Sequence, residues 1–185
     1  MSKDTETTKP EMPSERNGGE QYLTFIVDDE EYGVDILRVQ GIQGWSGATP
    51  IPGTPEHVLG VINLRGSVVP IVDLRSRFGL PTLAFSTTTV VIVLRVDGED
   101  KERIVGVVVD AVSEVYNVSD NDIQSMPEVG SAIDTKYVRG LATLDNEMVI
   151  LLDVDQLLSI DLTVVAEDGS QVASELGEAE SSQAA

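Results

Sequence analysis

The chain has 185 residues and a formal net charge of -20, because 32 acidic residues outnumber 12 lysines and arginines. This balance argues against nucleic-acid binding, which needs clustered cations to release counterions from phosphates. The lack of cysteine excludes disulfides and thiol chemistry, and no apolar run approaches the ~18 residues of a membrane helix. The acidity also fits a halophilic source, whose salt-rich cytoplasm screens self-repulsion; a merely acidic protein is the alternative.

The two ends of the chain differ from its middle. Residues 1–19 and 163–185 are polar and have no apolar periodicity, which predicts disordered tails, the second of them acidic. The charged start lacks the apolar segment of a signal peptide. We therefore expect a cytoplasmic protein whose folded part covers about 20–162.

The middle of the chain is rich in short runs of Val, Ile and Leu between turn residues, which is typical of β-strands. The runs predict strands at 21–28, 31–35, 39–45, 58–64, 67–73, 88–96, 102–110, 112–118, 138–144 and 147–153. Tight turns that tolerate positive φ are predicted at Asp28-Asp29-Glu30, Arg65-Gly66, Asp97-Gly98 and Asp145-Asn146. Helical patterning is scarce, with short turns expected at 73–78 and 154–159.

The two halves of this middle resemble each other. Glycines, apolar residues and hairpin turns recur in step when Gly60–Leu74 is aligned with Gly140–Val154, Gly33–Ile42 with Gly106–Val115, and Leu23–Val27 with Val90–Leu94. Each half then holds five strands, and a five-stranded sheet removes its open edges by closing into a small barrel.

The repeat therefore predicts an all-β fold of two five-stranded barrels packed together, with short helices and a seam between the barrels. We place the subdomains at approximately 28–85 and 86–153, with the first strand open to sharing between them.

The sequence offers little for catalysis or metal binding. His57 is the single histidine and has no cysteine to accompany it, so a zinc site is not expected. Paired carboxylates could serve an acid hydrolase, but the candidate aspartates have the context of strand ends and helix caps; they are Asp28, Asp35, Asp73, Asp110 and Asp153. No phosphate-binding glycine loop occurs. We predict no catalytic residue, metal or cofactor, and infer a function in recognition.

Three segments, taken in order, resemble the CheW family of chemotaxis coupling proteins. They are Phe25–Gln40, Ile51–Arg75 with its Gly-Val-Ile-Asn-Leu-Arg-Gly hairpin, and Val105–Val115 with Gly140-Leu141 downstream. The resemblance covers about 20–160. It implies two five-stranded SH3-like barrels that bridge methyl-accepting chemoreceptors, through their cytoplasmic signalling tip, to the regulatory domain of the histidine kinase CheA. The protein would be recruited to membrane-associated receptor arrays without entering the membrane.

The resemblance also implies the binding residues. Receptor contacts would lie in the groove between the barrels, at Ile36, Val39, Gly60, Asn63, Arg65, Val109 and Val112. Kinase contacts would involve Gly140 and Leu141. Many relatives carry an acid at the position of Gly41, so a charge pair there is not expected in this chain.

Alternative interpretations remain at this stage. Arg65 at a hairpin tip can reach a partner carboxylate, or it can be a turn residue in solvent. Trp45, the single tryptophan, can anchor a loop or form a binding hot spot. The chain could also be a stand-alone copy of the kinase regulatory domain or, more remotely, an acid hydrolase.

Overall fold

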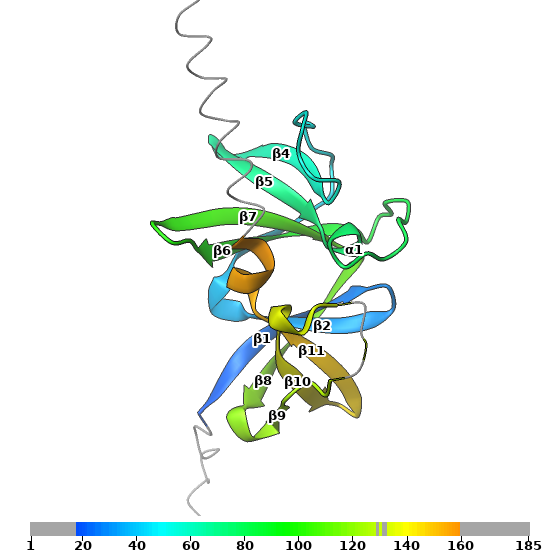
Figure 1. The fold of residues 1–185 in the computed structure, drawn as a ribbon, viewed down its shortest axis with the longest axis vertical. Helices are drawn as coiled ribbons and strands as arrows, with labels where there is room; N and C mark the ends of the chain where they lie inside the picture. The colour runs from blue at the N-terminus through cyan, green and yellow to red at the C-terminus, as the bar shows by residue number, and fades with distance from the viewer. Residues whose placement is uncertain (1–17, 129, 131–132, 160–185) are drawn as a thin grey trace, which may run out of the picture.

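The computed structural model describes residues 18–128, 130 and 133–159. The tails expected at 1–19 and 163–185 lie outside this part, except for residues 18 and 19. The described residues form two β-sheets stacked in the long direction of the molecule (Figure 1). The mostly β architecture predicted from the sequence is thus confirmed.

One sheet has six strands in the order β8-β1-β2-β11-β10-β9 and the other has five in the order β3-β6-β7-β5-β4. The strands are β1 (Gly19–Val27), β2 (Glu30–Asp35), β3 (Val39–Gly44), β4 (Val58–Leu64), β5 (Ser67–Asp73), β6 (Val90–Asp97), β7 (Glu102–Val109), β8 (Ala111–Ser119), β9 (Ile123–Gln124), β10 (Val138–Leu144) and β11 (Glu147–Leu152). All ten predicted strands are present, and β9 is an additional short one.

Within the described residues, helical structure is confined to short turns. These are η1 (Ile36–Arg38), α1 (Leu74–Arg77), η2 (Asp120–Asp122) and η3 (Thr135–Tyr137), with a further helical turn at 154–159. The helical turns predicted at 73–78 and 154–159 are therefore confirmed. Asp73 caps α1 because its carboxylate accepts a hydrogen bond from the Arg75 amide.

Three of the four predicted tight turns have left-handed backbone at their centres. Asp28 and Asp29 have φ of 54° and 62°, Arg65 has 52°, and Asp145 and Asn146 have 49° and 67°. This geometry matches the twist of two-residue hairpins, for which Asp, Asn and Gly are suited. The β6–β7 connection is longer, because Asp97 pairs with Glu102 across four intervening residues.

The internal repeat extends to the hydrogen-bond register. The β4–β5 ladder shifts between Val58 and Gly60, and the β10–β11 ladder shifts between Val138 and Gly140, at the aligned positions. The parallel pairs also correspond, because Ile71 faces Gly106 and Leu151 faces Gly33. For the first strand, the pairing makes Leu23 equivalent to Ile92, two residues from the expected alignment with Val90.

The connector strands are exchanged between the two sheets. After β2 in the six-stranded sheet, the chain passes through η1 and enters the five-stranded sheet as β3. After β7 in the five-stranded sheet, it returns to the six-stranded sheet as β8. The five-stranded sheet therefore contains residues 39–109, and the six-stranded sheet takes strands from both sides of it. The subdomain limits near 28–85 and 86–153 stay a prediction.

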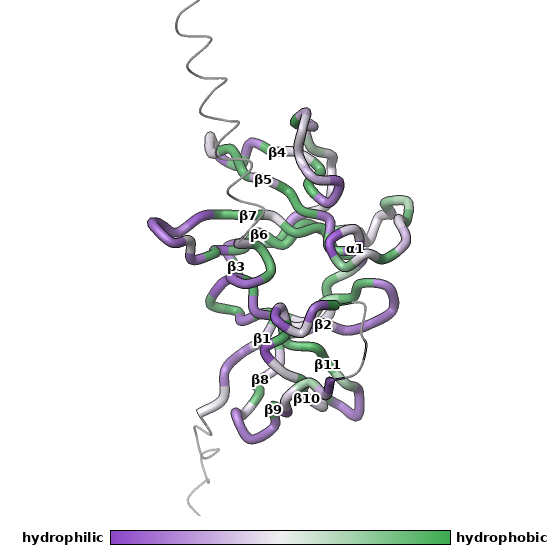
Figure 2. The backbone as a smooth tube through the Cα atoms, in the orientation of Figure 1, coloured by the Kyte–Doolittle hydropathy of each residue, from purple (hydrophilic) through white to green (hydrophobic). Residues whose placement is uncertain are grey.

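Three apolar clusters stabilise this arrangement. Each sheet has a small cluster of its own, one around Tyr22 and Leu151 and the other around Ile71 and Val91. The largest cluster takes side chains from both sheets and fills the seam between them. Figure 2 shows hydrophobic stretches within the strands, whereas the β1–β2 and β6–β7 turns are hydrophilic.

Candidate functional site

The β4–β5 hairpin presents two of the predicted receptor-binding residues to solvent. Asn63 and Arg65 are both exposed. The Asn63 side-chain oxygen accepts a 2.8 Å hydrogen bond from the Gly66 amide, which fixes the turn. The Arg65 guanidinium forms no ion pair with any residue that the structure describes. Its five donors are therefore available to a partner.

Arg65 also lines a groove between β3 and the hairpin. This groove has a volume of about 380 Å³, and its walls include Ile42, Leu64 and Ile104. A second hollow of about 570 Å³ adjoins it at Gln43 and includes Asn63. A free guanidinium beside apolar walls suits a partner segment that carries a carboxylate next to apolar side chains.

Gly60 acts through the backbone. Its φ is +136° and a Cβ there would overlap the Thr49 carbonyl. The space lets Thr49 and Val61 exchange two 2.9 Å backbone hydrogen bonds, which adds a short bridge to the edge strand β4. Gly60 lies inside β4, where it shapes the hairpin and allows close backbone approach.

The other predicted receptor-binding residues lie at the two crossovers. By strand pairing Ile36 is equivalent to Val109, and Val39 to Val112. Val109 is buried, with 1% of its surface exposed, while the other three are partly buried against the cluster that fills the seam. Val109 therefore supports the seam from inside and offers no outer wall to a partner. The structure does not bring these four residues onto the Arg65 hairpin.

The predicted kinase-binding residues lie on β10. Gly140 is buried, and a Cβ there would lie 2.8 Å from the Gln124 carbonyl oxygen of β9. Leu141 is half-buried and pairs with Gln124. Gly140 is thus the counterpart of Gly60, since both admit a passing backbone segment beside the edge of a hairpin.

Exposed apolar side chains form two equivalent pairs that the sequence did not single out. Ile42 on β3 and Val115 on β8 are 47% and 49% exposed, and Val68 on β5 and Met148 on β11 are 69% and 58% exposed. The repeat alignment contains the information needed to find these residues, because Val68 aligns with Met148 and Ile42 with Val115. Both sheets therefore expose apolar side chains at matching positions.

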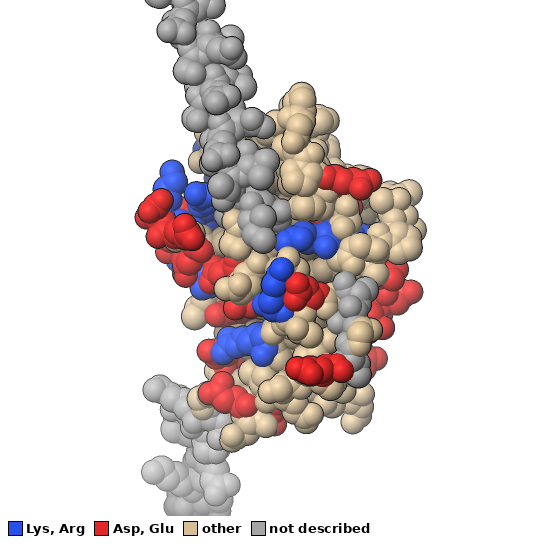
Figure 3. Space-filling model, viewed as in Figure 1, with Lys and Arg blue, Asp and Glu red and all other residues tan. Residues whose placement is uncertain are grey.

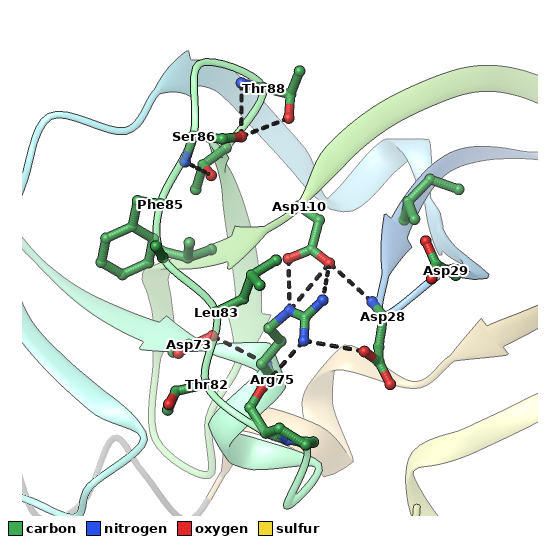
Figure 4. A pocket seen from close by; sticks show the side chains of 15 residues that line it. Asp28, Asp29, Asp73, Arg75, Thr82, Leu83, Phe85, Ser86, Thr88 and Asp110 are labelled. Carbon is green, nitrogen blue, oxygen red and sulfur yellow. Dashed lines mark hydrogen bonds and ion pairs between the residues drawn. The ribbon is translucent and has the colours of Figure 1, made fainter.

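Two ionic clusters connect the sheets, and we call them clamps. In the first, Arg75 of α1 donates to both carboxylate oxygens of Asp110 at 2.8–3.1 Å and to Asp28 at 3.1 Å (Figure 4). The Asp28 amide also donates to Asp110 at 2.9 Å. The first clamp therefore ties the β1–β2 turn to the β7–β8 crossover.

The second clamp lies at the other crossover. Arg38 of η1 contacts Asp155 at 2.7 Å and Asp97 at 2.9 Å, and the Asp97 amide donates to Asp155 at 2.8 Å. Asp155 occupies the position equivalent to Arg75, so the charge at this place is reversed between the clamps, whereas Asp97 is equivalent to Asp28 by strand pairing. Sequence reasoning missed both clamps, because the repeat alignment shows no shared residue there.

Comparison with known proteins agrees with the resemblance in the sequence. A family model described as a CheW-like domain matches residues 21–161. The chain belongs to the CheW family. It is 43% identical over 141 residues to the chemotaxis protein CheW of Rhizobium meliloti, covering 76% of this chain and 88% of that protein. It is 32% identical over 148 residues to that of Bacillus subtilis, covering 80% and 92%.

A solved CheW structure supports the same assignment. The scaffolding protein TtCheW from Thermoanaerobacter tengcongensis superposes with a TM-score of 0.68 at 34% identity, covering 76% of this chain and 92% of that one. CheW relatives are named as chemotaxis and scaffolding proteins, which agrees with the recognition function predicted here.

The carboxylates considered for acid hydrolysis have other contacts in this CheW fold. Burial raises the pKa of Asp110, but the Arg75 side chain and the Asp28 amide lower it below its usual value overall. Asp35, Asp73 and Asp153 accept hydrogen bonds from backbone amides of helical turns. Asp28 and Asp110 thus share an arginine, whereas a hydrolytic dyad shares a proton.

Two further features are absent from the described part of the chain. No group of three or more His, Asp or Glu side chains there is arranged to hold a metal ion. In the same residues no helix is long and apolar enough to cross a membrane.

Proposed function

We propose that this chain couples methyl-accepting chemoreceptors to the histidine kinase CheA by binding both at once. The observation that carries the proposal is the CheW-like domain, which spans residues 21–161 and so includes nearly every described residue. A coupling protein needs separate surfaces on one rigid body, and the two sheets supply them. Its place is the cytoplasmic signalling tips of receptor arrays.

The receptor surface is proposed to include the β4–β5 hairpin and residues at the two crossovers. Arg65 would donate to a carboxylate on the receptor's signalling helices, and Asn63 keeps the hairpin in the geometry that presents it. The partly exposed Ile36, Val39 and Val112 add apolar contacts, which a helix meets with residues spaced three and four apart.

The kinase surface is proposed on the six-stranded sheet. Gly140 and Leu141 shape the β9–β10 edge, and the exposed Met148 and Val115 supply apolar area. The regulatory domain of CheA, by the family resemblance, has the same fold. Equivalent apolar surfaces on the two sheets would let coupling protein and kinase domain alternate in rings.

Coupling through contact requires that a change at one interface reaches the other. The filled seam and the two clamps join the sheets, so a receptor that displaces the hairpin or crossover would act on the kinase surface through packed side chains. Each partner would bias the affinity for the other by the same factor.

The test is a pull-down with a receptor signalling fragment and with CheA, followed by kinase autophosphorylation with receptor present. Both partners should be retained, and the chain should restore receptor control. The Arg65→Glu variant should weaken receptor binding at least tenfold, since one charge-assisted hydrogen bond contributes about 1.5–3 kcal/mol. Kinase binding should persist. Lys101→Glu, the same charge change on the exposed β6–β7 loop, is the matched control.

Unchanged receptor affinity in the Arg65→Glu variant would remove Arg65 from the surface. The autophosphorylation assay also distinguishes a coupling protein from the alternative, a detached kinase regulatory domain. Such a copy would compete with intact CheA for receptors and lower the receptor-controlled activity. A coupling protein raises that activity, since intact CheA already contains its own regulatory domain.

A further inference from the structure

We propose that the cavity beside the first clamp binds a short segment of a partner protein that carries a cationic side chain next to an apolar one. The cavity has a volume of about 460 Å³ and lies between the loop 81–89, the β1–β2 turn and the β7–β8 crossover (Figure 4). It is separate from the Arg65 groove, with which it shares no lining residue. The proposal thus goes beyond the receptor and kinase surfaces proposed above.

The apolar wall of this cavity is held open to solvent. Leu83 and Phe85 are 60% and 49% exposed, although large apolar side chains gain by burial. Phe85 packs against the Trp45 ring at 4.9 Å between centroids, which keeps it at the rim. The volume lies within the range of sites that accept small ligands or a few side chains.

The loop that carries this wall is anchored at both ends. Arg75 donates to the Pro81 carbonyl at 3.1 Å. At the other end, the Thr89 hydroxyl accepts from the Ser86 amide at 2.9 Å, and the Trp45 amide donates to the Thr89 carbonyl at 3.1 Å. A wall fixed in advance loses little freedom on binding.

The charge of the cavity selects the occupant. Four aspartates and a single arginine line it, and they are Asp28, Asp29, Asp73, Asp110 and Arg75. That arginine is already engaged by Asp110, Asp28 and the Pro81 carbonyl. Asp29 is exposed and has no partner among the described residues. The cavity therefore keeps a negative charge that its own arginine does not neutralise. This charge favours a cationic side chain from a partner.

The positions of the apolar wall and of the aspartates specify the chemistry of the bound segment further. In Figure 4, Phe85 and Leu83 lie on one side of the Arg75 network, and Asp28 and Asp29 lie on the other. Figure 3 shows acidic side chains along the edge where the β1–β2 turn projects. A lysine or arginine beside a leucine or phenylalanine would meet both sides. The acidic end of this chain, 163–185, has no Lys or Arg and carries the wrong charge.

The experiment uses Trp45 as the probe, since it is the only tryptophan and contacts the cavity wall. The full chain is titrated with acetyl-Gly-Leu-Arg-Leu-Gly-amide, and with the same peptide carrying Glu in place of Arg, or Ser in place of both Leu. We expect a saturable change in Trp45 emission with the first peptide and none with the other two. Isothermal titration provides the affinity.

Two variants locate the binding. Asp29→Asn should weaken the first peptide at least threefold, and asparagine keeps the turn because it accepts positive φ. Asp145→Asn removes the same charge from the equivalent kind of turn on the β10–β11 hairpin and should change nothing. Phe85→Ser should weaken binding at least tenfold while thermal melting shows a folded chain.

Several results would overturn the proposal. They are no saturable signal from the arginine peptide up to about 5 mM, equal binding of the glutamate peptide, or equal weakening by Asp29→Asn and Asp145→Asn. The outcome does not depend on receptor or kinase binding, so failure here leaves the coupling function untouched.

Discussion

The first clamp should contribute more to stability than the second, because its charges are more deeply buried. In the first clamp the side chains of Arg75, Asp110 and Asp28 are 11%, 26% and 45% exposed, against 22%, 29% and 55% for Arg38, Asp155 and Asp97 in the second. Breaking a buried pair costs about 3–5 kcal/mol, whereas an exposed pair contributes about 0–1 kcal/mol. Arg75→Met should therefore lower the free energy of unfolding by about 2 kcal/mol, and Arg38→Met by about 1 kcal/mol.

The assay is urea unfolding followed by Trp45 fluorescence, with the midpoint read at an unchanged slope. Methionine keeps the apolar stem of arginine, so the comparison reports the charge and its hydrogen bonds. A double-mutant cycle of Arg75→Met with Asp110→Asn should show coupling of about 1–2 kcal/mol, since the residues are in contact. Equal losses at the two clamps, or a loss below about 0.5 kcal/mol for Arg75→Met, would refute this reasoning.

Three further predictions concern pH, backbone space and salt. Burial raises the pKa of Asp110 but Arg75 lowers it overall, so its stabilisation is complete above the unfolded-state value of about 3.9 and is lost as the pH falls through the lower folded-state pKa. Asp110→Asn should therefore lose less stability than the parent between about pH 4 and pH 2 in urea unfolding; equal losses would exclude Asp110 as a source of acid sensitivity. Gly60→Ala should lower the melting temperature, because a Cβ would overlap Thr49, whereas Gly41→Ala has open space and should stay within about 0.5 kcal/mol. The melting temperature should rise from dilute buffer to molar KCl, since salt screens the net charge of -20; a flat response would count against a halophilic adaptation.

Local chemistry made the strands and turns predictable. Asp28-Asp29, Arg65-Gly66 and Asp145-Asn146 stand between β-branched runs, and only a hairpin accommodates both features. The strand β9 was missed because two residues carry no periodicity of their own. It forms only because β10 offers an unpaired edge beside it.

The exchange of connector strands lies beyond such local signals. Period-two patterning tells which face of β3 or β8 is buried, but each strand could complete either sheet equally well. The choice is made by the crossovers at Ile36–Arg38 and Asp110, where backbone direction and the clamps combine. Long-range pairings of this kind are absent from a pattern read along the chain.

The candidate site was partly predictable for the same reason. Arg65 is exposed because a hairpin tip has no sheet above it, and the sequence showed the tip. Val109 was expected at a groove wall, yet a valine at a strand end is equally suited to a core, and the seam buries it. The network of Arg75, Asp110 and Asp28 joins residues far apart in the chain, so only the fold brings them together.

The unequal composition of the two sheets sets an order for folding during synthesis. All strands of the five-stranded sheet have left the ribosome once Val109 has emerged. In the other sheet Glu31 must wait for Val149, the last major partner to be translated. Because chains emerge from the N-terminus, β1 and β2 are a lone hairpin, which is marginally stable in water, until β8 emerges and pairs with β1, and the other edge of β2 stays unpaired until β11 arrives. The nascent chain should therefore resist proteolysis first within 39–109, then β1 should gain protection with β8, and β2 should be fully protected only near chain completion.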